Sequence, residues 1–210
     1  MSLVLVIGNK TYSSWSLRAA LAMELAEAPY SEVLIPLDRA DSRARILEHS
    51  PTGKVPLLKT EEGPVWDSLA IGEYLAESFP EAYLWPRGEY ARAVARSVCA
   101  EMHSGFAALR THLPMDLKRD QALDEMPADA EADIRRICAL WAECRGNFGE
   151  GGPFLFGHAS LADAFFAPVA ARLRSYRVAL PEVAAAYVAT VYQWPAFQRW
   201  YQAAQEERLE

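Results

Sequence analysis

The chain has 210 residues, of which 51% are hydrophobic and 23% charged, and its formal net charge is −7. This composition is typical of a globular protein with ample length for a core, and the negative charge argues against nucleic acid or an anionic membrane as the main partner. No stretch is long enough to span a membrane, we predict no signal peptide, and three cysteines do not form a disulfide framework. We therefore expect a cytoplasmic protein.

Strand and helix signals alternate over the first 80 residues. Residues 3–7 are consecutive apolar residues, as in a strand buried on both faces, and an amphipathic helix runs from Leu17 onward. A second strand is predicted over residues 30–37, parallel to the first because a helix connects them, with Pro36 favouring the sheet edge.

Two further short strands and two helices complete this first part. A short helix is expected after Asp41, then a turn and a short strand over residues 50–59, an antiparallel strand at 65–66, and a helix capped by Asp67. The order β-α-β-α-β-β-α predicts a thioredoxin-like α/β domain over residues 1–80.

The remainder of the chain shows only helical patterns. Residues 81–87, with Trp85 and Pro86, predict a linker, and residues 88–210 predict an all-α domain. Helices are expected over 89–113, 128–148 and 161–174, and from Pro181 and Pro195 onward. Ser160 and Asp163 form a capping-box pattern, which explains Asp163 as a folding residue.

The turn between the first strand and the first helix is rich in hydroxyl groups. Ser13, Ser14 and Ser16 lie where a helix begins, beside unpaired backbone N–H groups and the positive end of the helix dipole. This arrangement favours an anion. Serines at a helix start also act simply as caps, and that alternative stays open.

Four segments together resemble the cytosolic glutathione transferases over nearly the whole chain. They are Ser13-Ser14-Trp15-Ser16-Leu17-Arg18, Gly53-Lys54-Val55-Pro56, Asp67-Ser68-Leu69-Ala70-Ile71 and the stretch from Phe156 to Asp163. The serine-rich turn is most similar to the zeta-like bacterial branch. The resemblance implies the glutathione transferase fold, a homodimer, and conjugation of the co-substrate glutathione to small electrophilic molecules, as in detoxification.

The resemblance assigns the catalytic role to a hydroxyl that holds the glutathione sulfur as thiolate. Lowering a thiol pKa from about 8.5 to about 6.5 needs roughly 2.7 kcal/mol. One hydrogen bond to a charged sulfur contributes about 1.5–3 kcal/mol, so a serine at the helix start suffices without a general base. Ser13 is the first choice, Ser14 the second, and the hydroxyl of Tyr12 is a rival.

The remaining motifs are expected to bind the tripeptide. A cis Val55–Pro56 step would leave the backbone of Val55 free to pair with extended glutathione. Ser68 at a helix N-terminus would hold the γ-glutamyl carboxylate, with Asp67 accepting from its ammonium group. Lys54 would meet the other carboxylate or the peptide backbone, and Tyr12 and Trp15 would line the same pocket.

The second-substrate pocket is expected along the predicted helix 89–113. Met102, His103, Phe106 and Arg110 lie near one another on its surface, which fits either a substrate pocket or a packing face. Arg18 is expected to form a structural ion pair. The four histidines show no metal-ligand spacing, so no metal is expected.

Three functions stay open at this point. The first is conjugation, and the second is glutathione-dependent cis–trans isomerisation of a maleyl-type diacid, with Arg110 and Arg174 as positive groups. The third is a non-catalytic binding module with the same fold. Dithiol–disulfide exchange is excluded, because serines occupy both positions of the Cys-x-x-Cys motif at Ser13 and Ser16.

Overall fold

The computed structural model describes residues 3–208, and it begins with a four-stranded sheet of order β2-β1-β3-β4. The strands are β1 (Leu3–Ile7), β2 (Tyr30–Leu34), β3 (Leu57–Lys59) and β4 (Pro64–Val65). β1 runs parallel to β2 and antiparallel to β3, and β3 is antiparallel to β4. As the apolar run and Pro36 predicted, β1 is central and β2 lies at the edge.

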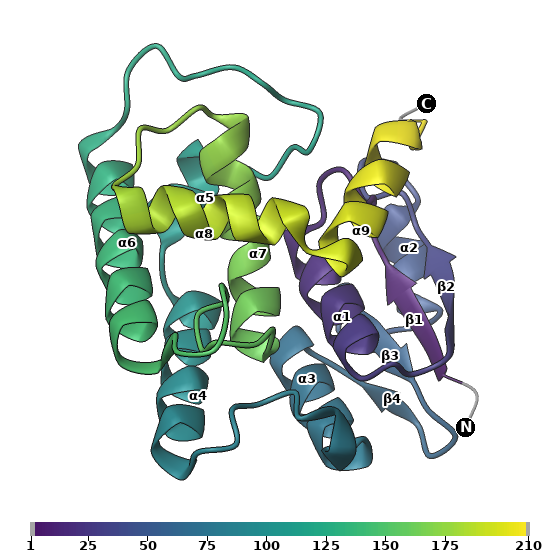
Figure 1. Ribbon diagram of the computed structural model, residues 1–210. Coiled ribbons are helices and arrows are strands. Elements are labelled where there is room, and N and C mark those ends of the chain that lie inside the picture. Colours follow the sequence, from purple (N-terminus) through teal and green to yellow (C-terminus); the bar gives the residue numbers. More distant parts are fainter. Residues whose placement is uncertain (1–2, 209–210) are drawn as a thin grey trace.

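Helices cover both faces of this sheet (Figure 1). α1 (Ser14–Leu25) and α3 (Ser68–Ser78) pack together on the face toward the helical half. α2 (Ser42–Leu47) covers the other face, where its Ile46 packs against Val6, Ile35 and Leu57. The predicted thioredoxin-like fold of the first part is confirmed.

A short 3-10 helix, η1 (Pro80–Ala82), and an irregular stretch lead into the helical half. Its helices are α4 (Glu89–Ser104), α5 (Ala107–His112), α6 (Ala128–Phe148), α7 (Leu161–Ser175), α8 (Glu182–Gln193) and α9 (Pro195–Glu206). The capping box at the start of α7 is present, as predicted. No helix within residues 3–208 is long and apolar enough to cross a membrane.

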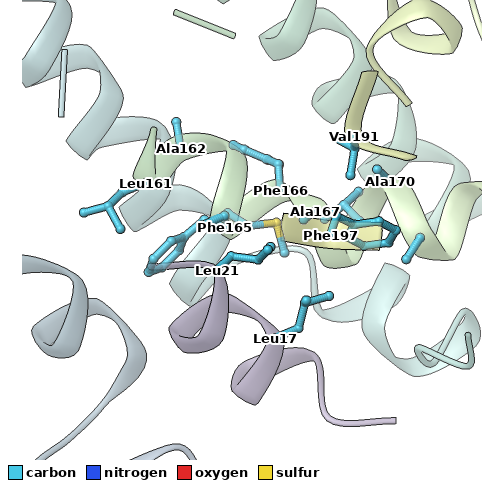
Figure 2. Packing of buried hydrophobic residues seen from close by; sticks show 14 of the residues in the cluster. Leu17, Leu21, Leu161, Ala162, Phe165, Phe166, Ala167, Ala170, Val191 and Phe197 are labelled. Atoms are coloured by element: carbon cyan, nitrogen blue, oxygen red, sulfur yellow. The ribbon is translucent and has the colours of Figure 1, made fainter. Parts of the chain in front are cut away.

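α7 is buried along almost its whole length and joins the two halves. It packs against both α1 and α4, and Figure 2 shows Leu17 and Leu21 of α1 beside Phe165 and Ala167 of α7. These residues belong to a single buried hydrophobic cluster that continues from the sheet into the helical half. A shared core therefore fixes how the sheet half and the helical half lie against each other.

The prediction of one helix over 89–113 is wrong, because the chain breaks between α4 and α5. Gly105 has an extended backbone in which an added Cβ would lie 2.8 Å from the carbonyl oxygen of Glu101. Phe106 then adopts a left-handed conformation with φ of 57°. The break turns the residues after Ser104 out of the helical register that the sequence pattern suggested.

Candidate functional site

A cavity of about 680 Å³ opens beside the serine-rich turn. Its lining comes from the turn into α1, from Leu37 and α2, from the loop before β3, from the residues that precede α3, and from α4. It brings together most of the predicted site residues, namely Tyr12, Ser13, Ser14, Trp15, Lys54, Val55, Pro56, Asp67 and His103. Sequence segments separated by up to about 90 residues therefore form one pocket.

Ser13 caps α1, and its hydroxyl is engaged within the turn. Its Oγ accepts a hydrogen bond from the Ser16 backbone N–H at 3.3 Å and donates to the Ser16 Oγ at 2.8 Å. The Ser16 Oγ in turn accepts from the Gly8 N–H at 3.0 Å. The hydroxyl proton of Ser13 thus has a partner inside the protein.

Ser14 is the first residue of α1, and its hydroxyl has a different environment. The Ser14 Oγ accepts a hydrogen bond from Nη2 of Arg172, on α7, at 3.2 Å. An oxygen that accepts in this way keeps its own proton for donation, and Ser14 lines the cavity. Ser14 can therefore donate to a group in the cavity without breaking a bond within the protein.

Tyr12 lies at the edge of the cavity, with 37% of its surface exposed. Partial burial and the nearby carboxylates of Asp116, Asp38 and Glu207 raise the pKa of its phenol above the usual value. The phenol therefore stays protonated near neutral pH, as a donor at the rim.

Val55 presents unused backbone groups to the cavity. The Val55–Pro56 peptide bond is cis. Within residues 3–208 the N–H and C=O of Val55 have no hydrogen-bond partner. The exposed side chain of Lys54 lies at the rim next to it.

Asp67 and Ser68 form the start of α3. The Asp67 Oδ1 accepts from the backbone N–H of Leu69 at 2.9 Å, and its Oδ2 lies 3.0 Å from Nε2 of His103. Ser68 is 1% exposed, and its hydroxyl has no partner among the described residues. A buried hydroxyl at a helix N-terminus that lacks a partner fits a bound carboxylate.

The predicted second-substrate residues divide between the cavity and the core. His103 lines the cavity and meets Trp15 edge-on at 5.1 Å between ring centroids. Met102 and Phe106 belong to the hydrophobic core and do not line the cavity. Arg110 is turned back by the break after α4, and it donates to the carbonyl oxygens of Gly105 and His103 at 3.1 and 3.2 Å.

Three arginines gather behind the cavity wall formed by Ser14 and Trp15. The guanidinium carbons of Arg18 and Arg110 lie 4.4 and 4.8 Å from the centroid of the Trp15 ring, and Arg172 donates to Ser14. Burial and the other two guanidinium groups lower the pKa of Arg18 to about 9, and burial and Arg110 lower that of Arg172 to about 10.

These arginines have no ion-pair partner in the described part of the chain. All three guanidinium nitrogens of Arg18, and Nη1 of both Arg110 and Arg172, are buried without a hydrogen-bond partner there. The structural ion pair predicted for Arg18 is therefore wrong. A cationic cluster of this kind makes the wall electrostatically suited to a negative group.

Arg172 is the site residue that sequence reasoning missed. The signal was an arginine within the apolar stretch of α7, where Leu173 and Ala171 are buried. Arg174, which the sequence suggested instead, is exposed and lies over the ring of Tyr192. Two residues along a helix turn a side chain by about 200°, which separates their positions.

No group of three or more His, Cys, Asp or Glu side chains between residues 3 and 208 could hold a metal ion.

Known proteins resemble this chain in its first part and, at lower identity, over most of its length. Residues 12–78 match the family model described as the glutathione S-transferase N-terminal domain. The glutathione S-transferase GstB of Escherichia coli is 26% identical over 192 residues, which cover 90% of this chain and 87% of GstB. Residues 12–78 of this chain are therefore similar to the N-terminal domain of glutathione S-transferases. A probable maleylacetoacetate isomerase of Caenorhabditis elegans is 34% identical over 96 residues, 46% of this chain and 44% of the worm protein.

The C. elegans match thus spans less than half the length of that relative. Among solved structures, a glutathione transferase homolog from Burkholderia with bound glutathione has a TM-score of 0.74, with 19% identity over 99% of this chain and all of the other. That likeness supports the glutathione S-transferase fold over both halves of the molecule.

Proposed function

We propose that this protein is a glutathione transferase that adds the glutathione thiolate to small electrophilic molecules. The observation that carries the proposal is the partnerless, buried hydroxyl of Ser68 at the start of α3. It lies next to the cavity that also contains the free backbone of Val55 and the hydroxyls of Ser13 and Ser14. These groups match the carboxylate, the extended backbone and the thiol of glutathione.

The backbone of Val55 would pair with the peptide in the manner of an added strand. Ser68 and the first turn of α3 would hold the γ-glutamyl carboxylate. The ammonium group would meet Asp67, which His103 already contacts from the helical half. Lys54, at the rim, would face the second carboxylate.

The sulfur would lie at the start of α1, and Ser14 is our preferred donor to it. Its proton is free because its oxygen accepts from Arg172. A hydrogen bond to a charged sulfur contributes about 1.5–3 kcal/mol, and a helix N-terminus adds about 0.3–1 kcal/mol. Together they favour the thiolate, which then attacks an electrophile held in the cavity beside Trp15 and His103.

Calorimetric titration with glutathione tests this proposal. The wild type should bind, and Ser68→Ala should weaken binding by roughly 10- to 100-fold, because a hydrogen bond to a carboxylate is lost. Ser97→Ala is the matched control, since Ser97 is exposed on α4 and donates only to its own helix. No binding at millimolar glutathione would end the proposal.

A second candidate is glutathione-dependent cis–trans isomerisation of a maleyl-type diacid. The cluster of Arg18, Arg110 and Arg172 favours it, because the positive charge of these buried groups behind the cavity wall would attract a substrate carboxylate. The thiolate would add to the double bond, the new single bond would rotate, and expulsion of the same thiolate would restore the double bond. The similarity to a probable maleylacetoacetate isomerase supports this alternative.

An assay with maleylacetone separates the two activities. Turnover of this diacid together with weak conjugation of halogenated substrates would favour isomerisation, and the reverse would favour conjugation. Binding of glutathione without turnover of either kind would indicate the third possibility, a non-catalytic binding module.

A further inference from the structure

The turn that carries Ser13 and Ser14 is held from outside by a residue almost 200 positions later in the chain. The carboxylate of Glu207 accepts the backbone N–H of Lys10 through Oε1 at 2.8 Å and that of Thr11 through Oε2 at 3.0 Å. One carboxylate thus satisfies two consecutive N–H groups of an irregular segment, with both of its oxygens engaged.

The C-terminal helix supplies further contacts to the same two residues. The Oγ1 of Thr11 donates to the carbonyl oxygen of Ala204 at 3.2 Å, and Nε1 of Trp200 donates to that of Lys10 at 3.0 Å. Figure 1 shows α9 beside the segment that leads from β1 into α1.

Glu207 is itself fixed from a third direction. Nζ of Lys118 donates to the Glu207 carbonyl oxygen at 2.6 Å, and the Leu117 N–H donates to the carbonyl oxygen of Thr11 at 3.2 Å. The loop after α5, the turn and the C-terminal segment therefore form one hydrogen-bonded unit.

This unit continues directly into the site. The carbonyl oxygen of Asn9 accepts the N–H groups of Tyr12 and Ser13 at 3.3 and 2.8 Å, which sets the backbone that enters α1. Lys10 and Thr11 lie inside that loop. A change in their position therefore moves the hydroxyls of Ser13 and Ser14 relative to the cavity.

We propose that Glu207 is a positioning residue that clamps the Lys10–Thr11 backbone so that the hydroxyl of Ser14 points at the glutathione sulfur. The proposal rests on the proposed function. Glutathione affinity depends on Val55 and Ser68, which the clamp does not touch. The strength of the hydrogen bond to sulfur depends on distance and angle, so loosening the turn weakens that bond first.

The test compares Glu207→Gln with the matched variant Glu206→Gln. Glu206 is the preceding residue, is exposed, and contacts only the side chain of Gln202 among the described residues. In Glu207→Gln the amide NH₂ faces a backbone donor, so one contact is lost. Glu207→Asp, which keeps the charge with a shorter reach, is the conservative variant, and thermal unfolding checks that all three variants fold.

For Glu207→Gln we follow kcat/KM for the electrophile at saturating glutathione, which reports the pKa of the bound thiol. We expect its pH midpoint to rise by about half a unit to one unit, so that activity below the midpoint falls about threefold to tenfold. Activity should recover at alkaline pH, and the Kd for glutathione should change by less than about threefold. Glu206→Gln should match the wild type, and Glu207→Asp should lie between the two. A loss of activity that is equal at every pH would overturn the proposal.

Amide hydrogen exchange provides a readout that needs no turnover. Exchange at Lys10 and Thr11 should rise about tenfold or more in Glu207→Gln and stay unchanged in Glu206→Gln. Unchanged exchange in Glu207→Gln, or faster exchange with an unchanged pH profile, would overturn the clamp alone. Absence of glutathione binding in the wild type would overturn the proposed function instead.

Discussion

At the scale of single residues, the adjacent serines Ser13 and Ser14 have different roles. Ser13 caps α1 and gives its proton to Ser16, whereas the oxygen of Ser14 accepts from Arg172 and leaves the proton of Ser14 free. The resemblance to the glutathione transferases favours Ser13, because its place in the turn matches that of the family's serine. The hydrogen bonds that distinguish the two hydroxyls involve Arg172, which lies 158 positions away.

Replacement of each serine by alanine should separate the contact to sulfur from the capping of α1. Ser14→Ala should raise the pH midpoint of kcat/KM by about one to two units, because one hydrogen bond to the thiolate is lost. Ser13→Ala should mainly lower stability by about 0.5–2 kcal/mol, as for other lost helix caps. Ultraviolet absorbance of the bound thiolate across pH checks the first effect, and urea unfolding the second. A larger pH shift in Ser13→Ala would assign the sulfur contact to Ser13.

At the scale of helices and strands, residue patterns predicted most elements of this protein. The apolar run at β1, the capping box of α7 and the prolines at the starts of α8 and α9 depend on neighbours in the sequence. The break between α4 and α5 does not, because Ala107 to His112 continue a helical pattern after Gly105. Arg110 helps to hold the break by donating to carbonyl oxygens at the end of α4.

The capping box of α7 gives a prediction about stability and pH. Asp163 is fully buried and accepts from the N–H groups of Leu155 and Ser160 and from the hydroxyl of Tyr187. Burial raises the pKa of this carboxyl to about 6 even though these hydrogen bonds lower it. In the unfolded chain its pKa is about 3.9.

The folded state therefore holds a proton on Asp163 over a range where the unfolded state has lost it. Its contribution to stability is present below about pH 4 and falls as pH rises to about 6, by on the order of 2–3 kcal/mol. Asp163→Asn should be less stable at every pH, and its deficit relative to the wild type should shrink over this window. Urea unfolding at several pH values measures it, with the exposed Asp124→Asn as the control. A deficit that grows with pH would contradict this assignment.

At the scale of the whole molecule, the site depends on contacts between the two halves. The sequence predicted which segments supply Val55, Ser68 and the serine turn, because each is a local motif. It did not predict that Arg172 reaches Ser14, that His103 reaches Asp67, or that Glu207 reaches Lys10. These contacts depend on how α7, α4 and the C-terminal segment pack against the sheet half, and no local pattern encodes that packing.

The shared core predicts that the two halves unfold together. Leu21 of α1 is 1% exposed and packs in the same cluster as Phe165 and Phe166 of α7, as Figure 2 shows. Leu21→Ala should cost about 2–5 kcal/mol, through lost burial and the cavity left behind. Because the cluster spans both halves, amide exchange in β1 and in α6 should rise by the same factor. Leu47→Ala, at a side chain that is 48% exposed on α2, should change stability by less than about 0.5 kcal/mol. Faster exchange in β1 with unchanged exchange in α6 would show that the sheet half opens on its own, and that α7 does not couple the serine-rich turn to the helical wall of the cavity.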